Sequence, residues 1–138
     1  MTMPAGKYYV GDLCYVMHNE WDEFCDITID GNKCLDGEFN LKDGRRFATF
    51  GTKWGDGLYK DQFGKEYSVD AGLIGCIRIE DIDLENEDNY TNGGQVIEFT
   101  RDFVVRGGRN ELGRDWDGVI EIGHLVIETD PEYDTEDY

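Results

Sequence analysis

Short runs in which apolar and polar residues alternate recur along most of this chain. A period of two is typical of strands that bury one face. The runs are closest together between residues 51 and 80, where they end in Leu73–Ile79, the most apolar run of the sequence and the predicted central strand. Further strands are predicted over residues 6–17 (in two halves around Gly11 and Asp12), 38–41, 45–50, 96–99, 103–105, 119–122 and 125–127.

Turn residues separate these runs at short intervals. Asp43-Gly44, the segment Gln62–Lys65 and the segment Trp54–Gly57 each stand between two runs, and such spacing predicts tight antiparallel hairpins. Residues 106–118 instead form a long loop rich in Gly and Arg, and loops of that length in a compact domain often carry function.

One segment has the pattern of a short helix. Asn19 is a good N-cap, acidic residues follow in the first turn, and Trp21, Phe24 and Cys25 form an apolar stripe. We therefore expect a helix of about two turns here.

The composition agrees with a strand-rich fold. The 138 residues include eighteen glycines and two prolines, and 13% are aromatic, as expected of many turns between short aromatic strands. We predict a mainly β, α+β fold with one short helix, built as an antiparallel β-sandwich or a partly open barrel. Residues 1–128 are predicted to form a single compact domain, and residues 129–138 an acidic, disordered tail.

Metal, membrane and export patterns are missing from the sequence. The four cysteines form no Cys-x-x-Cys pair and the two histidines stand apart from them, so no metal and no cofactor is expected. No apolar stretch approaches the roughly 18 residues of a membrane span, and the N-terminal residues have no signal-peptide core. We expect a cytoplasmic protein with reduced cysteines and no membrane partner.

The formal net charge of −18 is concentrated in two acidic runs, 80–88 and 128–138. A nucleic acid requires a basic footprint, so direct nucleic-acid binding is not expected. The first run predicts contact with a basic protein surface, through residues Glu80, Asp81, Asp83, Glu85, Glu87 and Asp88. The alternative is that both runs are solvated segments that keep the protein soluble.

Three aspartates stand at glycine-bearing corners of the predicted strands. If Asp12, Asp56 and Asp70 converged, their carboxylates could serve a metal-dependent hydrolase. Aspartate beside glycine is also ordinary turn chemistry. Because no nucleophile–base or metal motif can be assembled, we expect a protein that is not an enzyme.

Arginines and aromatic residues give a second alternative, a protein that sequesters a nucleotide such as a cyclic nucleotide. Arginine suits bidentate binding of phosphate, and Arg45 and Arg46 could meet the arginines of the 106–118 loop. The pocket would be formed by Trp54, Asp56, Tyr59, Arg106, Arg109, Arg114 and Trp116. These arginines could equally pair with the many neighbouring acids.

Two segments carry a resemblance. GKYYVGDLCYVM with NEWDEFCD, and WGDGLYKDQFGKEYSVDAGLIGCI, resemble recurring segments of a small uncharacterised protein family of bacteriophages and some bacteria, over roughly residues 4–80. The resemblance implies no activity. It implies a phage context, in which small acidic proteins of the host cytosol act in host takeover or counter-defence. We therefore expect a binding protein that occupies a basic host partner, and the sequence does not predict its oligomeric state. A further alternative is a structural or assembly component of a virion, which should form a stable oligomer.

Overall fold

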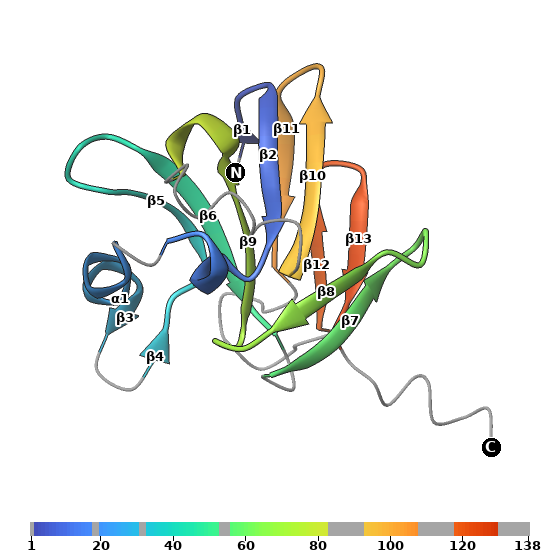
Figure 1. The fold of residues 1–138 in the computed structure, drawn as a ribbon, viewed down its shortest axis with the longest axis horizontal. Coiled ribbons are helices and arrows are strands. Elements are labelled where there is room, and N and C mark those ends of the chain that lie inside the picture. The colour runs from blue at the N-terminus through green and yellow to red at the C-terminus, as the bar shows by residue number, and fades with distance from the viewer. Residues whose placement is uncertain are drawn as a thin grey trace.

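Two antiparallel sheets packed face to face form the protein (Figure 1). The computed structural model describes residues 2–17, 20–30, 33–52, 56–82, 93–107 and 118–129. Within those ranges the sheets do not close into a barrel. The predicted mainly β class is confirmed, and of the two predicted architectures the structure has the sandwich.

The first sheet has five strands, in the order β10-β2-β9-β6-β5. They are β2 (Gly6–Gly11), β5 (Gly37–Asn40), β6 (Arg46–Gly51), β9 (Leu73–Arg78) and β10 (Gly94–Phe99). β9 pairs with β2 on one side and with β6 on the other, where Ile77 lies opposite Tyr9 and Phe47. The most apolar run of the sequence is therefore the central strand, as predicted.

The second sheet has six strands, in the order β1-β11-β12-β13-β7-β8. They are β1 (Thr2–Met3), β7 (Gly57–Asp61), β8 (Glu66–Val69), β11 (Phe103–Arg106), β12 (Val119–Ile122) and β13 (Leu125–Glu128). A separate small hairpin pairs β3 (Ile29–Asp30) with β4 (Lys33–Cys34).

Two of the predicted hairpins are confirmed, and each has a local cause. Between β5 and β6 the chain turns at Gly44, whose φ of 95° suits glycine. Between β7 and β8 the Asp61 carboxylate accepts the N–H groups of Phe63 and Lys65 at 2.8 and 3.0 Å, together with the Tyr67 hydroxyl at 2.8 Å. This side chain fixes the turn together with two backbone bonds of 3.0 Å, from the Asp61 N–H to the Lys65 carbonyl and from the Gly64 N–H to the Asp61 carbonyl.

The strand predicted over residues 6–17 is wrong in its second half. β2 ends at Gly11, and a 3₁₀ turn, η1 (Leu13–Tyr15), follows. Asp12 caps this turn, because its carboxylate accepts the Cys14 N–H at 2.9 Å. A second 3₁₀ turn, η2 (Ile79–Asp81), follows β9.

The predicted helix forms, but it is displaced along the chain. α1 spans Trp21–Thr28, and Glu20 precedes it without a side-chain cap. The helix continues to Thr28 because Ile27 and Thr28 extend the buried side, and the Thr28 hydroxyl donates to the Phe24 carbonyl at 2.8 Å. The predicted cap, Asn19, lies outside the described residues.

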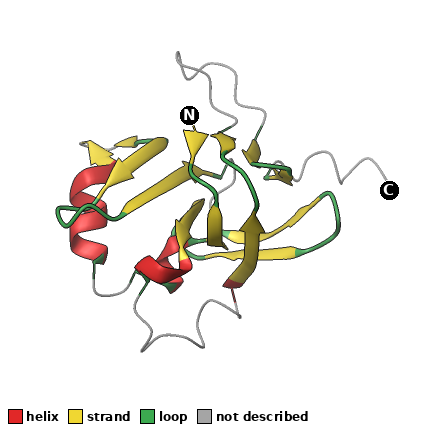
Figure 2. Ribbon diagram, turned by 90° about the horizontal axis from the view of Figure 1, so that it is seen from above, coloured by secondary structure: helices red, strands yellow, loops and turns green. Residues whose placement is uncertain are grey.

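The five-stranded sheet is buried on both faces. Tyr8, Val10 and Phe50 point toward the second sheet, whereas Tyr9 and Phe47, their neighbours along the strands, point toward α1 and η1. Phe24 of α1 stacks on Phe47 with ring centroids 5.0 Å apart. Figure 2 shows α1 at one end of the molecule, so the helix covers only part of this second face.

The predicted tail begins at residue 129, but Thr129 is buried and its N–H donates to the Gly118 carbonyl at 2.8 Å. Residues 130–138 lie outside the described ranges. Among the helices of the described ranges, none has the length and apolarity needed to cross a bilayer.

Candidate functional site

Two of the three corner aspartates, Asp12 and Asp70, are joined by a hydrogen bond to the backbone. The Asp12 carboxylate accepts the N–H groups of Asp70 and Ala71 at 2.7 and 2.6 Å, so the η1 turn is tied to the β8–β9 turn. Asp70 in turn accepts the Tyr15 hydroxyl. Asp56 is exposed, and its charge is among those that raise the pKa of Cys14, after burial and Asp12.

This corner has structural bonds where a hydrolase would need free oxygens. Asp12 is fully buried and accepts three backbone N–H groups through its two oxygens. Its carboxylate therefore already has partners that satisfy it. In the described part of the chain no group of three or more His, Cys, Asp and Glu side chains is placed to hold a metal ion.

Arginines gather elsewhere than predicted. Arg45 and Arg46 line a cleft of about 350 Å³ together with Arg78 of β9, which the sequence analysis did not single out. The remaining lining residues are Pro4, Tyr8, Asp43, Gly44 and Asp81. A cleft of this size could hold a small ligand.

Carboxylates neutralise the arginines of this cleft. Arg45 binds Glu20 at 2.9 Å and Asp43 at 2.8 Å, Arg46 binds Glu38 at 2.5 Å, and Arg78 binds Glu80 at 3.2 Å. The bond from Arg46 lowers the pKa of Glu38, and burial raises the pKa of Asp81 on the cleft wall. Because five carboxylates surround the three arginines of this cleft, the cleft does not form a site for an anion.

The same arginines hold the N-terminal segment. Arg46 donates to the Thr2 carbonyl at 2.7 Å and Arg78 to the Ala5 carbonyl at 3.1 Å. The Tyr8 hydroxyl donates to the Pro4 carbonyl at 2.7 Å. The side chains of this cleft therefore hold residues 2–5 in place immediately before β2.

The other predicted nucleotide-binding residues do not meet in the described part of the chain. Tyr59 is only 7% exposed and lies in the core between the sheets, and Arg106 pairs with Glu121 across β11 and β12. The remaining four, Trp54, Arg109, Arg114 and Trp116, lie outside the described residues.

Only the start of the predicted acidic contact is described. Glu80 is exposed and paired with Arg78, while Asp81 is half-buried on the cleft wall. The predicted contacts Asp83, Glu85, Glu87 and Asp88 lie outside the described residues.

An apolar pocket lies between α1 and the ends of β6 and β9 in the five-stranded sheet. Its volume is about 70 Å³. Helix residues form one wall, and the ends of β6 and β9 form the other; the lining residues are Trp21, Phe24, Cys25, Thr28, Ile29, Leu35, Thr49, Gly51, Ala71, Gly72 and Leu73. Ile29 and Leu35 remain 43% and 38% exposed, which leaves an apolar surface at the mouth.

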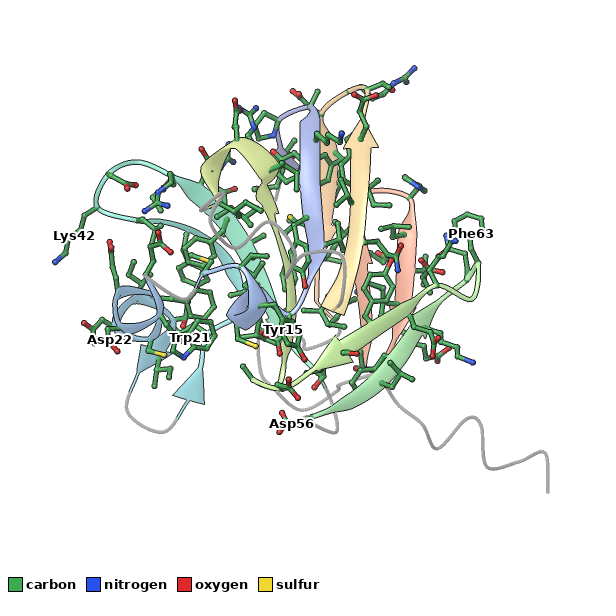
Figure 3. The ribbon with its side chains drawn as sticks, in the orientation of Figure 1. Tyr15, Trp21, Asp22, Lys42, Asp56 and Phe63 are labelled. Atoms are coloured by element: carbon green, nitrogen blue, oxygen red, sulfur yellow. The ribbon has the colours of Figure 1, made fainter. Side chains whose placement is uncertain are left out.

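Exposed acidic residues are the chain neighbours of residues that line this pocket. Asp22 and Asp26 are exposed on α1, one turn apart, and follow the lining residues Trp21 and Cys25 in the sequence. In Figure 3, Trp21 points from α1 toward the sheet and Asp22 away from it. Asp70 is exposed beside Ala71 on the opposite wall. In the part of the chain that the structure describes, no Lys or Arg pairs with these three aspartates.

The floor of the pocket holds a polar atom. Thr49 is 2% exposed, and its hydroxyl oxygen has no hydrogen-bond partner among the described residues. Thr49 shares the helix-facing side of β6 with Phe47, because the two are two residues apart on the strand. A buried hydroxyl without a partner costs free energy, so this atom favours an occupant that can bond to it.

The sequence predicts only part of this pocket. The sequence predicts the apolar stripe of the helix and counts Asp22 among the acids of its first turn, whereas it does not single out Asp26. Thr49 lies inside an apolar run, and no sequence pattern indicates that it lines a pocket. Comparison of the chain with protein-family models, with curated proteins and with solved structures gives no match. The resemblance to a phage family therefore stays a prediction.

Proposed function

We propose that this protein is a non-enzymatic binding protein that takes a positively charged segment of a protein partner on the α1 face. The observation that carries the proposal is the apolar pocket between α1 and the sheet, together with the exposed Asp22, Asp26 and Asp70 next to its lining residues in the chain, none of which has a described cationic partner. A cationic segment would supply those partners, and an apolar side chain of the segment would enter the pocket.

Electrostatics would act mainly on the rate and selectivity of binding. A net charge of −18 steers cationic partners toward the protein and repels polyanions. Each exposed ion pair contributes only about 0–1 kcal/mol, so charge alone would not hold one partner firmly. The pocket would supply the buried anchor that specific interfaces use. The resemblance to a phage family suggests a host protein as partner, in host takeover or counter-defence.

Defined peptides test this proposal without a known partner. The probe is a fluorescent Gly-Lys-Lys-Thr-Lys-Lys-Gly peptide, and the comparison is the same peptide with Glu in place of Lys. We expect the Lys peptide to bind, to perturb NMR signals of Trp21 and Leu73, and to weaken as salt rises from about 50 to about 300 mM. The Glu peptide should not bind.

A matched pair of variants separates this site from net charge. Asp22→Asn with Asp26→Asn removes two exposed charges from α1, and Glu66→Gln with Glu98→Gln removes two exposed charges from β8 and β10. We expect the first variant to weaken binding at least about fivefold and the second to weaken it less than twofold. Equal weakening by both would mean diffuse attraction to a charged surface and would refute the proposed site.

A further inference from the structure

We infer that the pocket between α1 and the sheet selects one threonine-sized side chain, whose hydroxyl bonds to the Thr49 hydroxyl, from within the basic segment. This inference rests on the proposed function and adds the chemistry of the anchor residue.

The size of the pocket limits the occupant. Its volume of about 70 Å³ is about half of the roughly 150 Å³ of an engineered protein cavity that binds benzene. A nucleobase, an indole or a phenyl ring is too large for it. A branched side chain of three heavy atoms fits, so threonine and valine are the natural candidates.

The walls require an apolar surface on that side chain. Trp21, Phe24 and Leu73 present carbon to the cavity. An ammonium group would lose its hydration there without gaining a carboxylate in the wall, so a lysine tip is not a suitable occupant. Lysines belong instead outside the pocket, where Asp22, Asp26 and Asp70 are exposed.

The floor distinguishes threonine from valine. The Thr49 hydroxyl can donate and accept, is 2% exposed, and has no partner among the described residues. A valine in the pocket would leave this oxygen without a partner, whereas a threonine hydroxyl would supply one.

The test is a two-by-two comparison of peptide and protein. Peptides Gly-Lys-Lys-X-Lys-Lys-Gly with Thr or Val at X are titrated against the intact protein and against Thr49→Val, which keeps shape but removes the hydroxyl. Phe and Ala at X measure the size limit. Thermal unfolding of Thr49→Val confirms that the variant is folded.

On the intact protein we expect the Thr peptide to bind about tenfold more tightly than the Val peptide, which corresponds to about 1.4 kcal/mol. Phe should bind more weakly than either. On Thr49→Val the preference for Thr should vanish or reverse. An equal affinity for Thr and Val on the intact protein, or a preference that survives in Thr49→Val, would overturn the hydroxyl contact.

The two proposals fail in different ways. Binding of all Lys peptides with no dependence on X, but with loss in Asp22→Asn with Asp26→Asn, would overturn the anchor and leave the proposed function standing. Absence of binding by every Lys peptide would overturn the proposed function and the anchor with it.

Discussion

Replacing Asp12 by alanine should cost this protein a large part of its stability. The carboxylate is fully buried and accepts three backbone N–H groups, from Cys14, Asp70 and Ala71, at 2.9, 2.7 and 2.6 Å. A hydrogen bond to a charged group contributes roughly 1.5–3 kcal/mol, and partial solvation of the freed donors reduces the sum. We expect a loss of about 4 kcal/mol, or about 15 °C in Tm.

Asparagine at the same position gives an intermediate result with a geometric reason. Its single carbonyl oxygen can take the place of Oδ2 and keep the bonds to Asp70 and Ala71. Its amide group then faces the Cys14 N–H, a donor against a donor. Asp12→Asn should therefore cost about 2 kcal/mol, half the cost of alanine.

Urea unfolding followed by tryptophan fluorescence measures both variants. Asp56→Ala is the control, because Asp56 is an exposed aspartate of the same corner and its substitution should cost less than about 0.5 kcal/mol. A loss for Asp12→Ala as small as that of the control would refute the structural role. Stabilisation of the intact protein by a divalent cation, abolished in Asp12→Asn, would support the metal-dependent hydrolase instead.

Three other perturbations follow from the packing. Thr49→Val should raise Tm by about 3 °C in thermal unfolding, because it removes a buried hydroxyl without a described partner. Gly75→Ala should prevent stable folding, since its Cβ would lie 2.1 Å from the Ala48 carbonyl oxygen, while Gly57→Ala should be tolerated. The hydrogen bond from Arg46 lowers the pKa of Glu38 below its ordinary 4.5. The stabilising contribution of Glu38 is therefore complete above pH 4.5 and is lost as the pH falls through the lowered value. When the free energy of unfolding is measured from pH 7 to 3, the difference between Glu38→Gln and the intact protein should shrink toward zero.

Reactivity of two cysteines is also predictable. Burial raises the pKa of Cys76 to about 12 and, together with Asp12, raises that of Cys14. Because the thiolate is the reactive form, both should react with iodoacetamide at pH 8 at least about a hundredfold more slowly in the native protein than in urea, as measured by mass spectrometry. Rapid labelling of the native protein at either residue would contradict the packing around it.

Local patterns were enough to predict most of the strands and two of the three hairpins, but not β1, β3 and β4. The apolar run that forms β9 and the glycine turn at Gly44 depend on neighbouring residues alone, so the sequence is enough to predict them. The helix was predicted from its stripe, but its bounds depend on packing of Thr28 against the sheet, which no local pattern encodes.

Contacts between distant segments could not be read in this way. Asp12 was noticed as a corner aspartate, but its bonds to Asp70 and Ala71 join positions 58 and 59 residues apart. Arg78 stood alone in an apolar run, and only the pairing of β9 with β2 brings it to Tyr8 and the N-terminal segment. The pocket forms where α1 packs over one face of β6. Because this contact joins distant segments of the chain, the sequence alone does not show that Thr49 lines the pocket.

The central claim is that a cationic segment binds at the pocket between α1 and the sheet, and NMR titration tests it most directly. The isotopically labelled protein is titrated with the Gly-Lys-Lys-Thr-Lys-Lys-Gly peptide, beside Asp22→Asn with Asp26→Asn. We predict saturable shifts confined to α1, Thr49 and Ala71–Leu73, with an affinity reduced at least about fivefold in the variant. Shifts spread over all acidic surfaces, unchanged in the variant, would contradict the account.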